Sequence, residues 1–410
     1  MRGKLCRLTL ENSGASEVPA IGLDAKRALY NHTGLGNYSR SVIWALHEFY
    51  ASAFRFILFY PQKTHVGDTY NLPDGIKHVF PTFGGGVLWR SFGIIRAIRK
   101  YRTALYHGLS NEIPFIWGYN SYCRWVVTIH DLAFLRLSRD YTVIDKCIHY
   151  LKVAYACRRA DAIVVVSEYT GKEIMRNFGV PPEKIRVIYP MVDPIFKVSW
   201  SAEERLHVQQ SLQLPNQYFL FVGSVTARKN LVTALRAWLM LPDQFRLPFV
   251  VVGKLTRGYR RDLKHFLNSI NQDLRQWVLF REVPTALLPA VYQGASLFVY
   301  PSLCEGFGLP VLEALQSGIP VVTSSTTSLP EVGGPGAFLA DPAHPESIYR
   351  GYLHFLENEN NRSHAIRLGY LHSTLFNPAE QAKKLAMLYS DLLKGTSGFS
   401  QFDKTIHENI

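Results

Sequence analysis

The sequence has few cysteines and no long apolar run. Its five cysteines are scattered over 410 residues and form neither a Cys-x-x-Cys pair nor a metal-ligand spacing. Such use is typical of the reducing cytosol rather than of a disulfide scaffold. No apolar run is long enough to cross a bilayer, and the polar first residues lack the apolar segment of a signal peptide. These absences predict a cytoplasmic protein without a membrane-spanning helix.

Acidic residues are too few to balance the basic ones. The formal net charge is +13, of which residues 1–195 carry +10 (25 Lys and Arg less 15 Asp and Glu) and the remainder +3 (20 less 17). A basic first half suits anionic partners such as phospholipid headgroups or lipid-linked diphosphates. No zinc finger, RNP-type aromatic motif or basic leucine zipper is present in the sequence, so we do not expect nucleic acid as a partner.

Two successive segments repeat an α/β pattern. Short strands rich in Val and Ile alternate with amphipathic helices, which predicts parallel sheets covered on both faces. The first segment has predicted strands at 20–24, 54–59, 104–106, 125–129, 162–166 and 185–188, and helices at 38–49, 88–101 and 144–158. The second has predicted strands at 218–222, 249–252, 277–280, 297–300 and 320–323, and helices at 231–239, 259–268, 287–294, 310–316 and 345–357.

This pattern predicts an α/β protein of two doubly wound, Rossmann-like domains that face each other across a cleft. We place them at residues 1–196 and 197–377, with the boundary in a polar stretch. Residues 378–394 are expected to form a helix that packs back on the first domain, and residues 395–410 to form a loose tail. In such sheets ligands bind outside the carboxyl ends of the strands, so each strand-to-helix turn is a candidate site.

The turn after the predicted strand 297–300 holds two glutamates and two glycines. Glu305 lies in the loop and Glu313 one turn inside the next helix. Gly306 and Gly308 expose backbone N–H groups at the start of that helix, where its dipole favours an anion. A carboxylate accepts paired hydrogen bonds from a vicinal diol, so one glutamate suits a sugar and the other a ribose, with phosphates between them. The pattern fits equally a glycine-rich connection with one solvated and one helix-capping glutamate.

Two turns of the first domain are further candidates. Gly34 and Gly36 precede a predicted helix and permit close approach of a phosphate, although two glycines are also common in tight turns. The dinucleotide fingerprint is incomplete, because Ser39 occupies its third glycine position. His130 follows the predicted strand 125–129, where a neutral imidazole can donate to a hydroxyl or carbonyl. The alternative is a structural histidine bonded to the adjacent aspartate.

Cations follow two strands of the second domain. Arg228 and Lys229 lie after the predicted strand 218–222, where they could neutralise a diphosphate that gains charge as a leaving group. An adjacent Arg-Lys pair is also common on solvated surfaces. Lys254 and Arg257 follow the next strand and would extend the same positive wall.

The segment 88–102 combines basic residues with an apolar face of Leu88, Phe92, Ile95 and Ile98. A basic amphipathic helix can lie on an anionic lipid surface. More commonly its apolar face packs on the sheet and its basic residues remain in water. We favour the packed helix and keep membrane contact by its charges as the alternative.

Together these turns make the sequence resemble the retaining glycosyltransferases of family 4, which have the GT-B fold. The resemblance covers roughly residues 21–393. Its most specific part is CEGFGLPVLEALQSGIPVV, in which seven residues separate Glu305 and Glu313. The strings TGLGNYSR, VVTIHDL and ARKN look most like mannosyl- and glucosyltransferases of surface polysaccharide assembly.

The resemblance implies a role for each matching residue. In the family, the loop of the first glutamate holds the donor sugar and its phosphates, and the second glutamate holds the ribose. The corresponding residues here are Glu305, Gly306, Phe307, Gly308 and Leu309 for the sugar and phosphates, and Glu313 for the ribose.

The remaining matches concern the diphosphate, the base and the opposite domain. Lys229 matches the diphosphate lysine, whereas Ser224 stands where an arginine often accompanies it, so Arg228 is the candidate substitute. The other positions implied are Gly34 and Gly36 in the glycine loop, His130 and Ser167 at the cleft, and Arg281 to Val283 beside the base.

The implied reaction transfers a hexose, mannose or glucose, with retention of anomeric configuration. The donor would be GDP-mannose or a UDP-hexose, and the acceptor a polysaccharide or lipid-linked glycan. Neither cofactor nor metal is expected, because the two cations take up the negative charge and no Asp-x-Asp string occurs in the sequence. The expected location is the cytoplasm, with the inner face of the plasma membrane as a candidate surface. A nucleotide-sugar-binding protein without turnover and a GT-B epimerase remain the alternatives.

Overall fold

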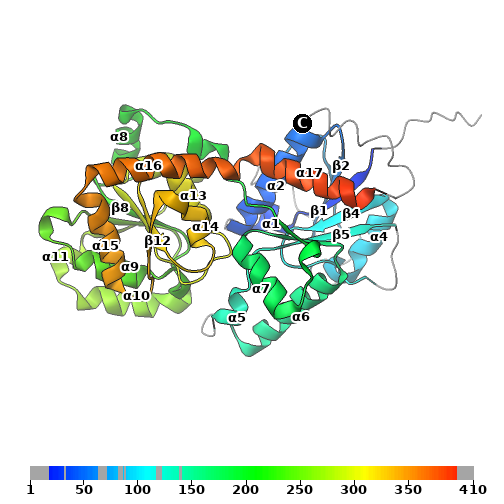
Figure 1. Cartoon of the computed structure of the whole chain (residues 1–410), viewed down its shortest axis with the longest axis horizontal. Coiled ribbons are helices and arrows are strands. Elements are labelled where there is room, and N and C mark those ends of the chain that lie inside the picture. The colour runs from blue at the N-terminus through cyan, green and yellow to red at the C-terminus, as the bar shows by residue number, and fades with distance from the viewer. Residues whose placement is uncertain are drawn as a thin grey trace, which may run out of the picture.

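Two parallel sheets, each covered by helices, form two lobes in the computed structural model (Figure 1). The structure describes residues 18–31, 34–62, 72–81, 86, 89–116, 122–137 and 141–394. We call the part built on residues 18–187 the first lobe and the part built on residues 202–373 the second lobe. Among the described residues, no helix is long and apolar enough to cross a membrane.

The first lobe holds a seven-stranded sheet of order β3-β2-β1-β4-β5-β6-β7. Its central strands are buried over their whole length, as expected for strands covered on both faces. The strands are β1 Ala20–Asp24, β2 Arg55–Phe59, β3 Lys77–Val79, β4 Thr103–Gly108, β5 Arg124–Ile129, β6 Ala162–Val165 and β7 Ile185–Val187. The helices are α1 Lys26–Tyr30, α2 Gly34–Tyr50, α4 Ile94–Lys100, α5 Ala133–Arg136, α6 Val143–Arg159 and α7 Glu168–Phe178.

The second lobe holds a six-stranded sheet of order β10-β9-β8-β11-β12-β13. The strands are β8 Phe219–Val222, β9 Phe249–Val252, β10 Val278–Arg281, β11 Leu297–Tyr300, β12 Val321–Ser324 and β13 Ala337–Ala340. The helices are α8 Ala202–Ser211, α9 Leu231–Leu239, α10 Arg257–Ser269, α11 Gln272–Arg275, α12 Leu288–Gln293, α13 Leu309–Gln316, α14 Leu329–Gly333, α15 Pro345–Leu356 and α16 Glu359–Ser373.

The predicted strands are confirmed to within one or two residues at each end. Two short strands were not predicted, β3 and β13, which lie at sheet edges and carry polar or exposed positions. Helices α7, α8 and α16 were also not predicted. Their N-caps, Ser167, Ser201 and Asn358, accept backbone hydrogen bonds, the usual sequence signal for a helix start.

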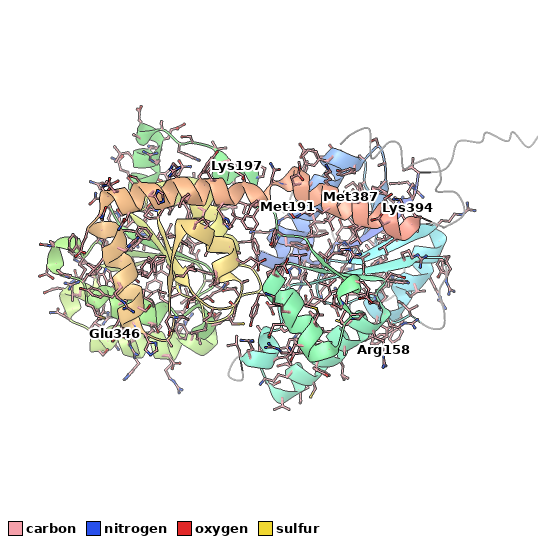
Figure 2. All side chains as sticks on the ribbon, in the orientation of Figure 1. Arg158, Met191, Lys197, Glu346, Met387 and Lys394 are labelled. Carbon is pink, nitrogen blue, oxygen red and sulfur yellow. The ribbon has the colours of Figure 1, made fainter. Side chains whose placement is uncertain are left out.

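The chain passes between the lobes twice. It first crosses after β7, where Met191 lies buried between them (Figure 2) and a short 3-10 turn follows at Pro194–Lys197. It returns after α16, and the last helix, α17 Pro378–Leu393, packs on α2 of the first lobe (Figure 1). The Arg124 Nε group donates to the Leu392 carbonyl at 3.1 Å and fastens the helix to β5. The last helix is therefore part of the first lobe.

The basic segment 88–102 packs on the sheet, as favoured from its sequence, but with a different face. A π-helical turn over Trp89–Gly93 precedes α4. Because a π turn inserts an extra residue, the buried positions are Trp89, Ile94 and Ile98, whereas Phe92 is 46% exposed. Of the predicted face, Phe92 was wrong by this shift, whereas Ile98 is buried and Ile95 is partly buried against the same core. Leu88, also assigned to that face, lies outside the described residues.

Candidate functional site

Two strand-to-helix loops of the second lobe meet because their strands are neighbours. β8 and β11 pair in parallel, so the loops that follow them leave the same edge of the sheet. The first loop starts at Gly223, whose φ of 140° is rarely adopted by residues with a side chain. It carries Arg228 and Lys229 in the 3-10 turn Ala227–Lys229. The second loop carries Glu305.

Arg228, Lys229 and Glu305 form one ion cluster, which we call the Glu305 cluster. Arg228 Nη1 lies 2.6 Å from Glu305 Oε2, and Lys229 Nζ lies 2.5 Å from Oε1. The Ser302 and Tyr300 hydroxyls also donate to Oε1, at 2.6 and 3.1 Å. The structure thus brings together the two loops that were identified separately in the sequence.

Burial and charge compete within this cluster. Burial raises the pKa of Glu305, but the charges of Arg228 and Lys229 outweigh burial and lower the pKa to about 2. Burial lowers the pKa of Lys229 to about 8, against the attraction of Glu305. At neutral pH two cations therefore face one carboxylate, which leaves a positive charge in a site of low exposure. Such a charge attracts a diphosphate more strongly than an exposed lysine would.

Glu313 has the opposite electrostatics. It is 8% exposed on α13, and its Oε2 accepts a hydrogen bond of 2.8 Å from the Tyr292 hydroxyl of α12. Within the described residues it has no ion-pair partner, and burial raises its pKa to about 7. The two glutamates of the motif therefore differ in charge near neutral pH. Glu305 is ionised, and Glu313 is poised between its two forms.

The loop of Glu305 contacts the first lobe through Gly306. A Cβ added there would lie 1.9 Å from the His130 carbonyl oxygen, so only glycine fits. The Ser167 hydroxyl donates to the Gly306 carbonyl at 2.7 Å, and the Thr170 hydroxyl lies 3.3 Å from the same oxygen. Ser167 also caps α7. The two lobes touch at the predicted site, with Ser167 and His130 on one side and the Gly306 loop on the other.

The remaining residues of the Glu305 loop pack against Leu329 and Phe376. Gly308 has a φ of 119°, and a Cβ added there would lie 2.5 Å from a Leu329 methyl group. Phe307 is buried, with its ring 5.4 Å from that of Phe376. Leu309 then begins α13. The backbone of this loop is therefore held in one conformation at the start of a helix.

His130 lies at the carboxyl end of β5, as predicted, and is buried. Its Nε2 lies 2.8 Å from the Leu109 carbonyl, so this nitrogen carries the proton and donates. The predicted alternative, a bond to Asp131, is not formed; the Asp131 carboxylate accepts from the Ala133 N–H instead. Burial lowers the pKa of His130, which favours the neutral ring. With Nε2 engaged, His130 can offer a ligand only its Nδ1 lone pair, as an acceptor rather than the expected donor.

The two glycines of the first lobe differ in surroundings. Gly34 begins α2, earlier than predicted, and a Cβ there would lie 3.9 Å from a Leu309 methyl group of the other lobe. Gly36 is required by its own turn, because a Cβ would lie 1.8 Å from the Asn31 carbonyl oxygen. Gly34 therefore faces the loop that carries Glu305, whereas Gly36 lets the chain turn into the helix.

The other candidate residues are not joined to the Glu305 cluster by any contact among the described residues. Arg281 donates to the carbonyls of Leu212 and Gln213, both at 3.0 Å, and so braces the end of α8. The side chains of Ser224 and Val283 are half-buried, Lys254 is exposed, and the Arg257 side chain lies outside the described residues.

Several supporting residues were missed in the sequence. Tyr300, Ser302 and Tyr292 hold the two glutamates, and the Ser328 hydroxyl donates to the carbonyls of Glu305 and Phe307. Tyr292 and Tyr300 read as ordinary apolar positions of a helix and a strand. Only their fully buried hydroxyls, which need partners, distinguish them from phenylalanine.

Comparison with known proteins assigns both lobes to families. The family model described as Glycosyltransferase Family 4 matches residues 33–196, and that described as Glycosyl transferases group 1 matches residues 202–372. The chain is 33% identical over 285 residues to O-antigen chain mannosyltransferase B of Escherichia coli, an alignment covering 68% of this chain and 72% of that protein. It is 27% identical over 217 residues to O-antigen chain mannosyltransferase RfbU of Salmonella typhimurium, covering 53% and 56%.

Solved structures of low sequence identity share the fold. WaaG, a glycosyltransferase involved in lipopolysaccharide biosynthesis, aligns with a TM-score of 0.68 at 14% identity, covering 92% of this chain and all of that one. HepE of Anabaena, in complex with UDP and glucose, aligns with a TM-score of 0.70 at 15% identity, covering 91% and 99%. The two Rossmann-like lobes are those of the GT-B fold.

Proposed function

Because the chain belongs to glycosyltransferase family 4, we propose that it transfers a hexose, preferably mannose, from a nucleoside-diphosphate sugar to a glycan acceptor with retention of configuration. The observation that carries the proposal is the Glu305 cluster, in which buried Glu305 and Lys229 and half-buried Arg228 meet where the lobes touch. Two relatives named as O-antigen mannosyltransferases support mannose and a surface polysaccharide as product. The donor is then GDP-mannose, with UDP-hexoses as the competing class.

In this proposal the cluster acts on the leaving group. Arg228 and Lys229 bind the diphosphate and stabilise the charge that it gains as the glycosidic bond breaks. Glu305 fixes both cations before the donor arrives, and its oxygens accept from sugar hydroxyls once the phosphates share those cations. Two fixed cations supply the charge that a metal ion provides elsewhere, so the reaction needs neither metal nor cofactor.

Positioning supplies the rest of the catalysis. The backbone N–H groups from Gly306 to Leu309 lie at the start of α13, where they suit the phosphates. Glu313 accepts from the ribose hydroxyls. His130 accepts a sugar hydroxyl through Nδ1, from the opposite lobe. Holding donor and acceptor between two lobes lowers the entropic cost of reaction.

A lipid-linked acceptor is favoured by the surface of α6. Val143, Ile144, Ile148 and Leu151 expose 77, 72, 47 and 66% of their surface, and their spacing places them on one side of the helix. Such a stripe on a lobe of strong positive charge suits the cytoplasmic face of an anionic membrane. This stripe, rather than the packed segment 88–102, is the proposed membrane contact.

The proposal is tested by donor binding and by transfer. GDP, GDP-mannose, UDP and UDP-glucose are compared in a thermal-shift assay, and labelled mannose is then followed from GDP-mannose into lipid-extractable or polymeric glycan. We expect stabilisation by one nucleotide class and transfer that Lys229→Ala reduces at least a hundredfold. The matched control is Lys264→Ala, an exposed lysine on α10. Absence of stabilisation by every nucleotide would refute the proposal, and nucleotide-sugar binding without transfer would identify a binding protein.

A further inference from the structure

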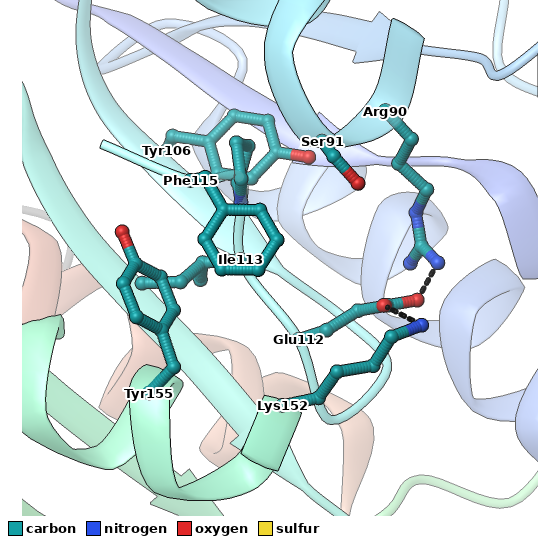
Figure 3. A pocket seen from close by; sticks show the side chains of 9 residues that line it. Arg90, Ser91, Tyr106, Glu112, Ile113, Phe115, Lys152 and Tyr155 are labelled. Carbon is teal, nitrogen blue, oxygen red and sulfur yellow. Dashed lines mark ion pairs between the residues drawn. The ribbon is translucent and has the colours of Figure 1, made fainter. Parts of the chain in front are cut away.

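A second cluster of charges lies at the carboxyl edge of the first sheet. Asp24 ends β1, and Glu112 follows the neighbouring strand β4. Arg90 pairs with both carboxylates, and Lys152 of α6 pairs with Glu112 at 2.9 Å. Figure 3 shows the two ion pairs of Glu112. The side chains of Asp24 and Arg90 are only 4 and 11% exposed. Arg90, Glu112 and Lys152 line a small cavity with Tyr106, Phe115 and Tyr155.

Cations outnumber carboxylates in this cluster. Lys26 and Arg27 of α1 adjoin Asp24, so four cations (Lys26, Arg27, Arg90 and Lys152) share two carboxylates. Within the described part of the chain, the Lys26 ammonium and the Arg27 guanidinium form no hydrogen bond or ion pair, and Arg27 Nε is buried without a partner. Burial lowers the pKa of Lys26 to about 8, and the nearby charges of Arg90 and Arg27 act in the same direction.

The unpaired cations are not needed to complete the internal ion pairs. Arg90 already satisfies Asp24, and the Ser110 hydroxyl lies 3.0 Å from Arg90 and 3.3 Å from Asp24. Holding two more cations against repulsion, partly out of water, is costly unless an anion joins them. The charge balance of the cluster therefore favours a ligand that carries at least one negative charge.

The cluster lies beside the proposed site. Its carboxylates follow β1 and β4, and β5, which ends before His130, pairs with β4. After burial, the charge of Arg27 also lowers the pKa of His130, so this arginine is within electrostatic reach of the histidine. A group bound at Lys26 and Arg27 would stand on the first-lobe side of the Glu305 cluster.

We propose that Lys26 and Arg27, supported by the neighbouring Arg90 and Lys152, bind a phosphate group of the acceptor, so that the enzyme glycosylates a phosphate- or diphosphate-bearing substrate. This inference rests on the proposed function and adds the chemical class of the acceptor. Lys26 and Arg27 make the direct contacts, and the Asp24–Arg90–Glu112 pairs fix their surroundings. Because Lys152 and the apolar stripe share α6, a phosphate carried by a lipid is the favoured source.

The test uses two phosphate probes on protein already saturated with GDP or UDP, whichever stabilises it, so that the donor site is filled. Binding of inorganic pyrophosphate and of farnesyl diphosphate is measured by calorimetry. We expect one equivalent to bind, and the dissociation constant to rise at least tenfold in the double variant Lys26→Gln/Arg27→Gln. Lys152→Gln, at a partly exposed position, should weaken both probes about threefold or more. The charge-matched control Lys264→Gln should bind them like the wild type.

The outcomes separate this inference from the proposed function. Nucleotide affinity should be equal in the wild type and the double variant, which also reports that the variant is folded. The phosphate site is refuted if the nucleotide-loaded protein binds neither probe. It is also refuted if the double variant binds both probes as well as the wild type does. Neither result affects the proposed glycosyltransferase function. Tighter binding of farnesyl diphosphate supports a lipid-borne phosphate, and equal binding supports the site with a soluble glycosyl phosphate as its source. A wild type that binds no nucleotide overturns the proposed function instead.

Discussion

The backbone of Gly306 lies so close to the His130 carbonyl that a methyl group would stand 1.9 Å from its oxygen. Gly306→Ala must therefore move the two lobes apart at the site. Because catalysis by positioning is sensitive to displacements of about 1 Å, we expect transfer to fall about a hundredfold. The matched control is Gly258→Ala on α10, where an added Cβ meets no atom within 4 Å. The measurement is the rate of sugar transfer by the two variants. Equal rates would show that the close approach of Gly306 to His130 is not needed for transfer.

Glu313 predicts a particular dependence of stability on pH. Burial raises its pKa from 4.5 to about 7 in the folded protein, so the folded state holds its proton more tightly than the unfolded chain does. The stabilisation is full below about pH 4.5 and is lost as the pH rises through 7. Glu313→Gln removes this titration, which at 1.36 kcal/mol per pKa unit is on the order of 3 kcal/mol.

The free energy of unfolding of the wild type and of Glu313→Gln, measured with urea between pH 4.5 and 8, checks this prediction. We expect the difference to change in favour of the glutamine variant as the pH rises. A constant difference would show that Glu313 titrates normally. Glu305 has the opposite sign, because its lowered pKa gives stability that is present above about pH 4.5 and is lost as the pH falls towards 2.

At the scale of single elements, α6 carries the membrane prediction. Ile144→Ser/Leu151→Ser removes two of the most exposed apolar side chains of the stripe. We expect sedimentation with vesicles containing anionic lipid to drop at least fivefold, because apolar insertion and charge act together. The control Leu371→Ser/Leu375→Ser changes two leucines that are 54 and 58% exposed, on α16 and on the 3-10 turn that follows it. If both double variants sediment like the wild type, α6 does not contact the membrane.

The last helix is tied to the first sheet by a buried polar chain. The Tyr389 hydroxyl lies 2.6 Å from His107 Nδ1, His107 Nε2 lies 2.8 Å from the Thr128 hydroxyl, and that hydroxyl lies 3.0 Å from Tyr38. Tyr389→Phe leaves the imidazole of His107 short of a partner, so we expect a loss of about 1–3 kcal/mol in the free energy of unfolding. Tyr370→Phe, at a half-exposed position of α16, should cost less than about 0.5 kcal/mol. If Tyr389→Phe and Tyr370→Phe unfold at the same denaturant midpoint, the hydrogen bond of Tyr389 to His107 does not stabilise the protein.

How much of the fold and of the site could be predicted from the sequence differs from element to element. Strands such as β5 and β9 were predictable because burial on both faces leaves continuous apolar runs. The π turn over Trp89–Gly93 was not, since it shifts a helical face without a local signal. Arg228 pairs with Glu305 because the strands before them, β8 and β11, are neighbours in the sheet. The order of strands in a sheet cannot be deduced from one amino-acid sequence. The exposed stripe of α6 was missed because its apolar spacing equally fits a buried face.

At the scale of the whole molecule, the carboxylate of Glu331 links the lobes at a second place, outside the loop that carries Glu305. Glu331 of α14 accepts from the Glu168 N–H at 2.9 Å and from the Tyr169 N–H at 3.5 Å. These are the first N–H groups of α7, so an acidic group of the second lobe serves the helix start of the first. Together with Ser167 and Gly306, this contact favours the arrangement in which the lobes touch.

Glu331→Ala should therefore shift the lobes towards a separated arrangement without unfolding either one. We expect a larger radius of gyration in solution scattering, a transfer rate about tenfold lower, and recovery of the compact form when donor nucleotide is added, because a ligand held by both lobes favours their contact. Glu346→Ala, an exposed acid in the first turn of α15, lies far from the contact (Figure 2) and should change none of these. If both variants scatter alike, Glu331 does not hold the lobes together. If Glu331→Ala stays expanded with saturating nucleotide, closure depends on this carboxylate more than on the donor.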